Sequence, residues 1–311
     1  MIDNILICGD NLETMKKLYE EHGSFIDLIY IDPPFCSNRN YGIDKKGFED
    51  KWNGGLKTYL PWLMERIQWM HKLLKDTGSI FVHLDWHAAH YVKVEMDKIF
   101  GYDNFLNDII WHYDGPQSPS NLKFANKHDI ILRYSATKAT RAYELYGFEK
   151  IHQSDAHYQI DDKGRWFYHL PKGDYSEESI KKLDQAGRIY TTRNGKVRIK
   201  YFVEKKGEFF YRQKKLADVW NDVTPISIKS TDPEKLGYPT QKPEKLLERI
   251  ILSSSNENSV VADFFSGSGT TVIVAEKLDR QWIGVDQNPQ AIEVTTKRLQ
   301  QISKQKENIN D

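Results

Sequence analysis

The sequence predicts an α/β protein with a doubly wound, mostly parallel β-sheet and one inserted basic region. Short apolar runs of strand length alternate with segments of helical apolar spacing, as in βαβ units. This alternation stops near residue 115 and resumes at residue 237. Between these points residues 116–215 hold 21 Lys and Arg against 12 Asp and Glu, although the net charge of the chain is zero. Such an asymmetry indicates a polyanion-binding region, with a solvated, lysine-rich insertion as the alternative.

The first hundred residues supply the first strands and helices of this sheet. The strand that ends at Ile31 is closed by Asp32 and two prolines, which cannot continue a hydrogen-bonded ladder. The first helix is capped by Asp10 or Asn11, and later helices end near Gly78 and at Gly101. The predicted strands are 5–8, 25–31 and 79–84, and the predicted helices are 12–19, 58–75 and 91–100.

The βα rhythm of the last 75 residues completes the same sheet. Pro243 starts a helix with one apolar face, and residues 259–264 and 281–286 read as strands separated by a small-residue loop and a helix. In the region between, residues 190–199 predict a hairpin that turns at Asn194 and Gly195. We therefore expect one sheet built from both ends of the chain.

The composition excludes several classes of protein. Hydrophobic residues make up 39% of the chain, enough for a core, so a disordered protein is not expected. Cys8 and Cys36 are too few for a disulfide framework or for a zinc site of their own. No apolar run approaches the roughly 18 residues needed to cross a bilayer, and the start lacks a signal-peptide pattern. We expect a cytoplasmic protein without a membrane partner and without a bound metal.

A small-residue turn at 263–271 (DFFSGSGTT) joins a strand to a helix. Gly267 and Gly269 let the backbone approach a ligand, and the helix N-terminus offers N–H groups to an anionic group. The turn lacks the Lys of a phosphate-binding P-loop, and Val272 takes the place of the third small residue in the dinucleotide fingerprint. Asp286, at the end of the next strand, is placed to accept hydrogen bonds from ribose hydroxyls. These features favour a nucleoside ligand.

A second motif, Asp32-Pro33-Pro34-Phe35, stands directly after a strand, at the sheet edge where doubly wound proteins bind ligands. The two prolines fix the backbone of the turn. A rigid turn with a carboxylate, a carbonyl and an aromatic ring suits a planar amine that is held by its edge and stacked. On the tetrapeptide alone, an ordinary end of a strand with a buried Phe is the alternative.

A third motif, at 237–243 (GYPTQKP), opens the helix that precedes the small-residue turn. Thr240 and Lys242 near this helix N-terminus can bind a carboxylate group. By itself the motif is no more than a capped helix with Pro at its start.

In this order along the chain, the three motifs resemble the amino-methylating DNA methyltransferases of the permuted β class. In that family an Asp-Pro-Pro-Phe/Tyr motif precedes a Phe-x-Gly-x-Gly loop, and a target-recognition region lies between them. The chain is especially similar to adenine-specific members related to the modification subunits of type III restriction systems. The similarity runs over nearly the whole chain and includes segments 9–11 (GDN), 78–85 (GSIFVHLD), 108–111 (DIIW), 187–190 (GRIY), 218–220 (DVW), 238–243 (YPTQKP) and 280–286 (RQWIGVD).

The resemblance implies a Rossmann-like class I methyltransferase core, circularly permuted, with a catalytic half at 1–115, an inserted target-recognition region at 116–236 and a cofactor-binding half at 237–311. It implies S-adenosylmethionine as cofactor and methyl transfer to the exocyclic N6 of a flipped-out adenine in duplex DNA. The implied catalytic residues are Asp32, Pro33, Pro34 and Phe35. The implied cofactor-binding residues are Asp10, Asp32, Thr240, Lys242, Asp263, Phe265, Ser266, Gly267, Ser268, Gly269, Thr270 and Asp286.

The resemblance further implies double-stranded DNA as partner, and it allows for a homodimer and a cognate restriction endonuclease. Basic residues of the inserted region would contact phosphates and position the duplex without reading its sequence. These residues are Lys196, Arg198, Lys200, Arg212, Lys214 and Lys215.

Three alternatives to an adenine methyltransferase follow from the same residues. A cytosine-N4 methyltransferase uses the same stacking and displacement chemistry, but Asp rather than Ser at position 32 favours adenine. RNA or protein amide methyltransferases typically carry Asn-Pro-Pro-Tyr, which differs from Asp32-Pro33-Pro34-Phe35 here. A non-catalytic DNA-binding subunit would be expected to lose Asp32 or the loop glycines, and both are present.

Overall fold

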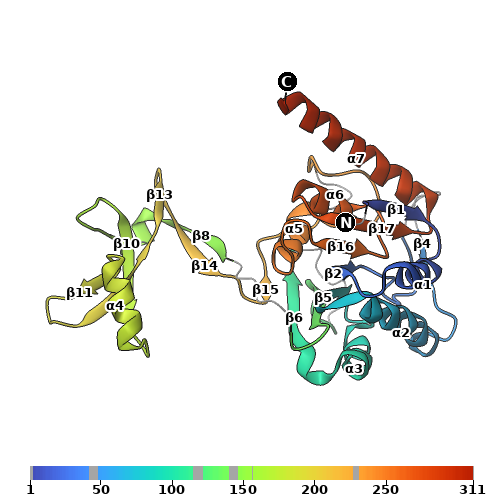
Figure 1. Ribbon diagram of the computed structural model, residues 1–311, viewed down its shortest axis with the longest axis horizontal. Helices are drawn as coiled ribbons and strands as arrows, with labels where there is room; N and C mark the ends of the chain where they lie inside the picture. The colour runs from blue at the N-terminus through green and yellow to red at the C-terminus, as the bar shows by residue number, and fades with distance from the viewer. Residues whose placement is uncertain are drawn as a thin grey trace. The chain divides into compact units, whose positions relative to one another are not determined.

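A computed structural model describes residues 3–41, 48–114, 122–139, 146–155, 157–226 and 231–310. The chain forms two compact units (Figure 1). The first contains Met1–Tyr143 and Ala217–Asp311, and the second contains Glu144–Leu216. Among the helices of these described segments, none is both long enough and apolar enough to cross a bilayer.

The first unit is built on an eight-stranded sheet with the order β1-β17-β16-β2-β5-β7-β6-β15. All neighbouring strands are parallel except at β7, which runs antiparallel to β5 and to β6. The predicted α/β class and the mostly parallel sheet from both chain ends are confirmed. The strands are β1 (Ile5–Cys8), β2 (Ile26–Ile31), β5 (Leu74–Leu84), β6 (Phe105–His112), β7 (His128–Ser135), β15 (Val219–Trp220), β16 (Val260–Asp263) and β17 (Gln281–Asp286).

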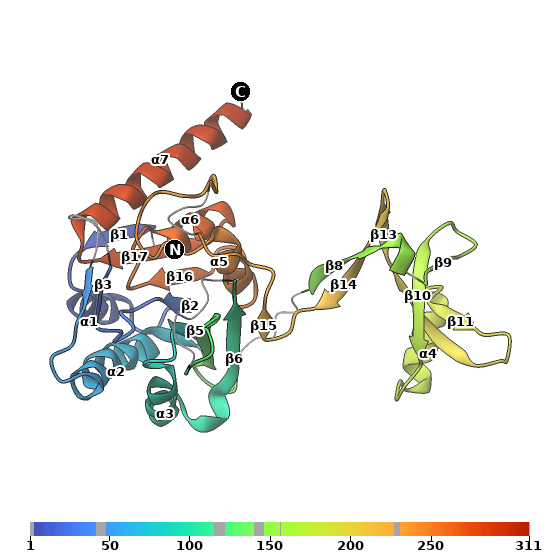
Figure 2. The ribbon, with the colours of Figure 1, turned by 180° about the vertical axis from the view of Figure 1, so that it is seen from behind.

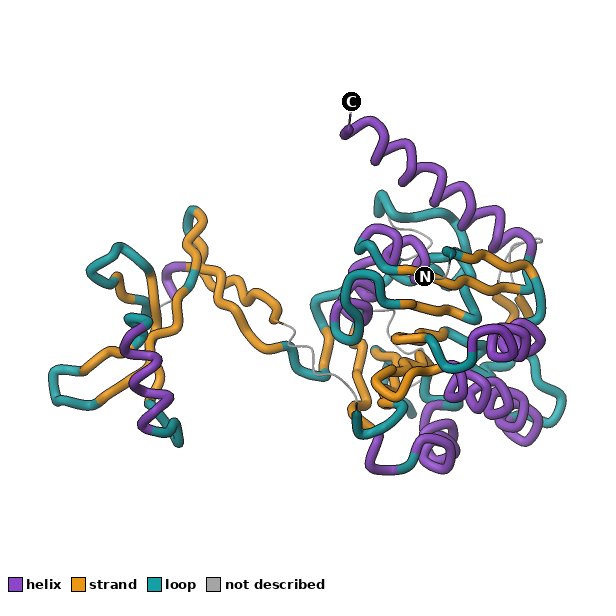
Figure 3. Tube along the Cα trace, in the orientation of Figure 1, coloured by secondary structure: helices purple, strands orange, loops and turns teal. Residues whose placement is uncertain are grey.

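Helices cover both faces of this sheet (Figures 2 and 3). The residues of β2 alternate between the two apolar layers: Ile29 and Ile31 pack with the first helices of the chain, and Leu28 and Tyr30 pack with the last ones. This alternation is why the strand is apolar throughout and not on one side alone. One face carries α1 (Asn11–His22), α2 (Leu56–Leu73) and α3 (Ala89–Phe100); the other carries α5 (Glu244–Leu252) and α6 (Thr270–Lys277), and α7 (Pro289–Asn310) packs against α6.

Local signals in the sequence explain where the helices start and stop. The Asp10 carboxylate caps α1 by accepting hydrogen bonds from the backbone N–H groups of Leu12 and Glu13. Gly23, with φ of 65°, ends the same helix. Pro243 precedes α5 at the N-cap position, as predicted. Smaller elements of the unit are the β3 (Arg39–Tyr41) and β4 (Phe48–Asp50) pair and the 3-10 turn η2 (Tyr102–Asn104).

The second unit contains two small antiparallel sheets and one helix. The hairpin predicted at Asn194 and Gly195 is confirmed, because β11 pairs with β12 and Gly195 has a φ of 74°. One sheet has the order β11 (Ile189–Thr191), β12 (Val197–Phe202), β10 (Trp166–Pro171) and β9 (Gln159–Ile160); the other has β13 (Glu204–Lys206), β14 (Phe209–Lys215) and β8 (Tyr146–His152). The helix is α4 (Glu177–Gln185), and η3 (Gln153–Asp155) is a 3-10 turn.

The inserted unit, Glu144–Leu216, is shorter than the expected range of 116–236. The difference arises because β7 and β15 belong to the large sheet. Strand β7 lies directly beside β6 and runs antiparallel to it, so it interrupts the parallel βα rhythm on which the expected boundary rested. Strand β5 likewise begins at Leu74, directly after α2, and not at residue 79.

Gly269 is the tightest backbone position of the small-residue turn. It has a left-handed φ of 75°, and a Cβ atom there would clash with the buried side chain of Thr295 from α7, whose own Cβ would lie 2.8 Å away. Gly267 has a φ of 51°, but the nearest atom to its added Cβ would be 3.7 Å away. Only Gly269 is therefore required for packing as well as for backbone conformation.

Gly269→Ala should lower the free energy of unfolding by about 2–4 kcal/mol, combining left-handed strain with overpacking. Gly267→Ala, the matched control, should lower it by only about 1–2 kcal/mol because it meets only the conformational cost. Urea titrations followed by circular dichroism measure both. Equal losses of unfolding free energy in the two variants would show that the contact with Thr295 adds no cost at Gly269.

Candidate active site

Five neighbouring parallel strands each deliver an aspartate to the same edge of the sheet. Asp286 and Asp263 end β17 and β16, and Asp10, Asp32 and Asp85 closely follow the ends of β1, β2 and β5. Because these strands are parallel neighbours, their carboxyl ends meet. The edge is therefore rich in carboxylates.

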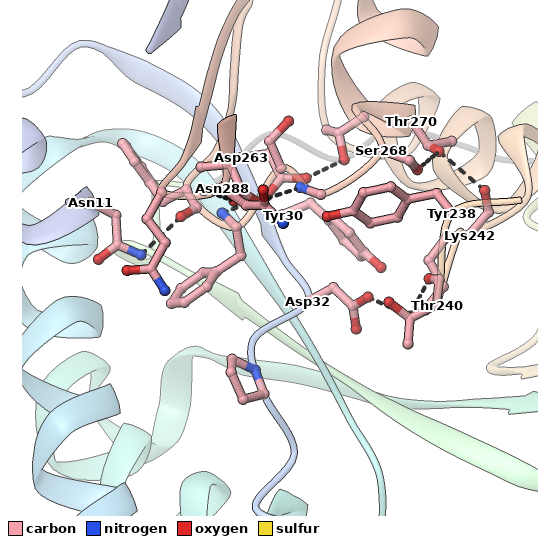
Figure 4. A pocket seen from close by; sticks show the side chains of 18 of the residues that line it. Asn11, Tyr30, Asp32, Tyr238, Thr240, Lys242, Asp263, Ser268, Thr270 and Asn288 are labelled. Atoms are coloured by element: carbon pink, nitrogen blue, oxygen red, sulfur yellow. Dashed lines mark hydrogen bonds and ion pairs between the residues drawn. The ribbon is translucent and has the colours of Figure 1, made fainter. Parts of the chain in front are cut away.

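A cavity of about 710 Å³ opens at this edge, and four of the five aspartates line it (Figure 4). Asp85 is not among the lining residues. The lining side chains come from both ends of the chain: Gly9, Asp10, Asn11, Tyr30, Asp32, Pro34, Lys51, Trp52, Trp62, Arg66, Tyr238, Pro239, Thr240, Lys242, Leu247, Asp263, Phe264, Phe265, Ser266, Gly267, Ser268, Thr270, Thr271, Asp286, Gln287 and Asn288.

Asp286 fixes the small-residue turn against the end of β17. Its Oδ2 accepts a hydrogen bond from the backbone N–H of Gly267 at 2.8 Å, and its Oδ1 accepts one from Asn288 at 2.8 Å. The Ser266 N–H donates to the carbonyl of Val285 at 3.0 Å. Each Asp286 oxygen keeps a further lone pair for a ligand hydroxyl.

Asp263 connects the two ends of the turn through its side chain and is almost completely buried. It accepts hydrogen bonds from the backbone N–H of Phe265 at 2.9 Å and from the Thr271 hydroxyl at 2.5 Å. Burial raises the pKa of this carboxyl to about 7, with a smaller contribution from the charges of Asp32 and Asp286. Asp263 therefore supports the turn and carries a proton more readily than an ordinary aspartate.

Asp32 is held differently from the other aspartates. Its Oδ2 accepts a short hydrogen bond from the ammonium of Lys242. Its Oδ1 is buried and has no hydrogen-bond partner among the described residues. Figure 4 shows Asp32 pointing toward the segment that carries Thr240 and Lys242. A buried acceptor without a donor is a place where a ligand N–H can bind.

Phe35 lies beside this aspartate but does not line the cavity. Its ring stacks on His83, with centroids 5.9 Å apart and planes 24° apart, and packs against the apolar core. The buried His83 is fixed by the Tyr30 hydroxyl at 2.9 Å from Nδ1 and by the Asp129 carboxylate at 3.1 Å from Nε2. His83 is therefore structural, and the position of Phe35 is set by a buried polar chain.

Asp50 fixes the backbone that follows Phe35. Its carboxylate accepts hydrogen bonds from the N–H groups of Cys36 at 2.9 Å and Ser37 at 2.7 Å, from the Ser37 hydroxyl at 2.6 Å and from the Trp52 indole at 3.0 Å. Cys36 adopts a left-handed φ of 60° in this turn. No sequence motif indicated Asp50, because its role depends on a contact with residues 13 and 14 positions earlier.

An aromatic wall, formed by Trp52, Trp62 and Phe265, completes the cavity. The Trp62 ring lies 4.8 Å from Trp52 and 5.8 Å from Phe265. Arg66 stacks on Trp62 at 4.2 Å and pairs with Asp10 at 3.5 Å. Sequence reasoning missed both tryptophans and the arginine, since spacing within α2 gives no signal for a ligand.

The structure brings together most of the cofactor and catalytic residues expected from the sequence. Pro33, Phe35 and Gly269 do not line the cavity, although each is adjacent to residues that do. The residues that line it are Asp10, Asp32, Pro34, Thr240, Lys242, Asp263, Phe265, Ser266, Gly267, Ser268, Thr270 and Asp286.

The expected DNA-binding residues all lie in the second unit. Arg198 and Lys200 alternate on β12 and so share one face, which Tyr190 and His169 also occupy as their cross-strand partners. Those two rings stack at 4.4 Å with planes 11° apart. This face combines cations with half-buried aromatic rings. Lys196 lies in the preceding turn, and Arg212, Lys214 and Lys215 lie on β14.

Residues 26–297 match the model of the N6 and N4 methyltransferase family, described as DNA methylase. The chain belongs to the DNA methylase family. The methylase is 27% identical to the type II methyltransferase M.EcaI of Enterobacter cloacae, over 96% of this chain and 70% of that protein. It is 26% identical to the HindVI Mod subunit, a probable type III enzyme of Haemophilus influenzae, over 96% of this chain and 50% of the subunit. It is 26% identical to the Escherichia coli DNA adenine methyltransferase YhdJ, over 94% of this chain and 82% of that protein.

Solved structures of methyltransferases share the fold. The complex of M1.HpyAVI with S-adenosylmethionine superimposes with a TM-score of 0.54 at 19% identity, covering 95% of this chain and 98% of that one. The cytosine-N4-specific PvuII DNA methyltransferase gives a TM-score of 0.57 at 17% identity, covering 96% and 87%. These likenesses confirm the class I methyltransferase core of the methylase. They do not distinguish adenine from cytosine as the target.

Asp263→Asn should make the stability of the methylase less dependent on pH. Since folding raises the pKa of Asp263 from 3.8 to about 7, the folded state holds a proton in this range that the unfolded chain has lost. The contribution of this proton is present below about pH 4 and is lost as the pH rises through about 7. The variant should therefore gain stability relative to the wild type between about pH 4 and pH 8, by on the order of a few kcal/mol.

Urea titrations at several pH values measure this difference. Asp222→Asn is the matched control, because the hydrogen bond and charge of Arg249 lower the pKa of Asp222 to about 2. The difference in the free energy of unfolding between Asp222→Asn and the wild type should not change over the same pH range. If the difference for Asp263→Asn is also independent of pH, the raised pKa of Asp263 is contradicted.

Proposed function

We propose that the methylase transfers the methyl group of S-adenosylmethionine to the exocyclic N6 of an adenine that is flipped out of duplex DNA. The observation that carries this proposal is the buried Oδ1 of Asp32 on the wall of the cavity, which accepts no hydrogen bond from any residue that the structure describes. An exocyclic amine has two N–H donors, and an acceptor of this kind orients one of them. Membership of the DNA methylase family and the adenine-specific relative YhdJ support the same reaction and base.

The residues of the cavity fit S-adenosylmethionine. Asp10, Asp32 and Asp286 line the cavity together with three cations, Lys51, Arg66 and Lys242, and these carboxylates suit the positively charged sulfonium of the ligand. The oxygens of Asp286 suit ribose hydroxyls, and the aromatic wall suits a purine ring. Solved structures of M1.HpyAVI and of a Thermus thermophilus DNA modification methylase hold this cofactor. Asp10, Thr240, Phe265, Ser266, Gly267, Ser268 and Thr270 would complete its contacts.

The cofactor supplies a methyl group on a cationic sulfur; the amine nitrogen forms a bond to its carbon as the bond to sulfur breaks. The chain itself makes this nitrogen a better nucleophile. Hydrogen bonds from the amine to Asp32 Oδ1 and to the Pro33 carbonyl return electron density to nitrogen and fix its direction. The nitrogen becomes cationic as the bond forms, and the nearby carboxylate stabilises it. The proton then leaves to Asp32 or to water.

The target base must leave the helix to reach Asp32, at a cost of a few kcal/mol. Stacking on an aromatic side chain returns about 1–3 kcal/mol. Phe35 follows Asp32 by three positions, and its ring is stacked on His83. Pro34, which lines the cavity next to it, keeps this turn rigid.

Duplex DNA would be held by the second unit through the face of β12 that carries Arg198 and Lys200, with Lys196, Arg212, Lys214 and Lys215 as further phosphate contacts. The unit has 16 Lys and Arg against 11 Asp and Glu over residues 144–216. The stacked pair of Tyr190 and His169 offers an aromatic surface between these cations. The names of the type II and type III relatives support a restriction-modification context, with a homodimer and a cognate endonuclease as expected partners.

Cytosine N4 is the second candidate target, because the structural likeness to the PvuII enzyme is as close as that to M1.HpyAVI. Mass spectrometry of nucleosides from DNA incubated with methyl-labelled S-adenosylmethionine separates the two. Labelled N6-methyladenine supports the proposal. Labelled N4-methylcytosine would change the proposed target base to cytosine and leave the proposed mechanism unchanged. A chain that binds no S-adenosylmethionine would be a non-catalytic subunit.

Asp32→Asn should reduce methyl transfer at saturating cofactor by at least about 10³-fold, because the amide cannot stabilise a cationic nitrogen. Cofactor affinity and the unfolding transition should change little. The control is Asp103→Asn, an exposed aspartate paired with Lys138 outside the cavity. Single-turnover assays and calorimetric binding measure both. Wild-type activity in Asp32→Asn would remove this residue from the mechanism.

Arg198→Ala with Lys200→Ala should weaken DNA binding uniformly across sequences and reduce the slope of log affinity against log salt by about 2. Lys182→Ala in α4 is the matched control, since this lysine of the same unit pairs with Glu178 on the exposed helix. Fluorescence anisotropy at several salt concentrations gives the slopes. An unchanged slope in the double variant would exclude this face from phosphate contact.

A further inference from the structure

We propose that Lys242 is a positioning residue for the reaction: its ammonium binds Oδ2 of Asp32 and so presents Oδ1 to the target amine. This inference rests on the proposed function and deepens it. The sequence motif pointed instead to a role for Lys242 in binding the carboxylate of the cofactor. The contact observed with Asp32 gives the lysine a different task.

The two side chains form a shielded ion pair on the wall of the cavity. Lys242 is 11% exposed and Asp32 is 16% exposed. The ammonium binds one carboxylate oxygen, and the other is buried without a partner in the described part of the chain. Since a buried anionic oxygen without a donor costs free energy, the arrangement is balanced only when a ligand N–H binds there. In this pair Oδ2 of Asp32 is bound by Lys242, and Oδ1 is the oxygen that would accept the hydrogen bond from the target amine.

The backbone on both sides of Lys242 directs its side chain toward Asp32. Gln241 is buried, and its amide donates to the Glu234 carbonyl at 2.7 Å and accepts from the Leu236 N–H at 3.0 Å. The carbonyl of Lys242 itself accepts a hydrogen bond from the Thr270 hydroxyl at 3.2 Å, where α6 begins. These contacts fix the backbone from which the Lys242 side chain reaches Asp32.

Lys242 stands among several acidic groups, which explains why a cation is needed at this position. Asp32 raises the pKa of Asp263, behind the main effect of burial. Burial opposes ionisation of Asp129, but the His83 hydrogen bond and the charge of Lys242 lower its pKa overall. Burial is the main cause of the raised pKa of Tyr30, and the charge of Asp32 raises it further. Removing the ammonium would leave the Asp32 carboxylate beside these groups without the cation that holds its Oδ2.

Lys242→Met tests the proposal, with Lys242→Arg as the conservative variant and Lys245→Met as the matched control. Lys245 lies on α5 and pairs with Asp222 outside the cavity. At saturating cofactor and neutral pH, the rate of Lys242→Met should fall by about 10²-fold, because the carboxylate is misplaced. The affinity for S-adenosylmethionine should stay within about threefold, and the Arg variant should recover part of the rate.

The pH profile separates positioning from a merely structural effect. Loss of the cation beside the acidic edge of the cavity should move the acidic limb of the rate profile to higher pH. Repeating the series with Asp263→Asn removes the neighbouring carboxyl that titrates near pH 7. The limb of Lys242→Met should remain displaced in that background, while Lys245→Met follows the wild type.

Two results would overturn the proposal. A loss of cofactor affinity of about tenfold or more, with an unchanged rate at saturation and an unchanged pH profile, would assign Lys242 to the cofactor carboxylate. A wild-type rate and profile would exclude any role in the step. If the wild-type chain methylates no DNA, the proposed function fails first, and the carbon-13 chemical shift of the Asp32 carboxylate still tests the pair. A carboxylate shift that is the same in Lys242→Met as in the wild type would contradict it.

Discussion

The site of the methylase depends on the pairing of β16 with β2. Val261 and Ala262 are in register with Leu28 and Ile29, and the Asp27 carboxylate accepts a hydrogen bond from the backbone N–H of Val260 at 2.9 Å. These partners are more than 230 residues apart in the sequence. Because both strands run in the same direction, their carboxyl ends open on one side, and the small-residue turn faces the Asp-Pro-Pro-Phe turn across a single cavity.

Five aspartates lie at one edge of the sheet, and each needs contacts that stabilise its carboxylate. These contacts differ from one aspartate to the next. Asp286 and Asp263 receive backbone N–H groups and keep their turn closed. Asp10 caps a helix and faces Arg66. Only Asp32 relies on a lysine and keeps an oxygen without a donor, within the described residues. Carboxylates that are fully satisfied by the chain support the architecture, whereas the one left partly unsatisfied is available for chemistry.

The sequence was sufficient for the features that depend on neighbouring residues. Apolar runs ending in Asp predicted the strands and their functional edge, and the small-residue turn predicted the loop before α6. Features that depend on distant contacts were not accessible in this way. Strand β7 has the apolar run of a core strand, but its place between β5 and β6 follows from antiparallel return, which interrupts the βα pattern. Trp62 and Arg66 read as ordinary members of an amphipathic helix, and only the packed structure turns them toward a ligand. Phe35 was expected on the cavity wall, yet His83 holds its ring against the core.

The pair of Asp32 and Lys242 is also where the backbone carries its strain. Among the described residues, five other than glycine have a positive φ, and three of them are Cys36, Asn38 and Thr240. Cys36 and Asn38 follow the Asp-Pro-Pro-Phe turn, and Thr240 precedes Lys242 by two positions. A left-handed conformation is especially unfavourable for a β-branched residue such as threonine. Such strain persists only where surrounding contacts fix it, as the Asp50 carboxylate does at Cys36 and as the buried Gln241 does beside Thr240. Contacts of the backbone near Asp32 and near Lys242 thus fix both members of the ion pair. Oδ1 of Asp32 is therefore already in position before the proposed amine binds.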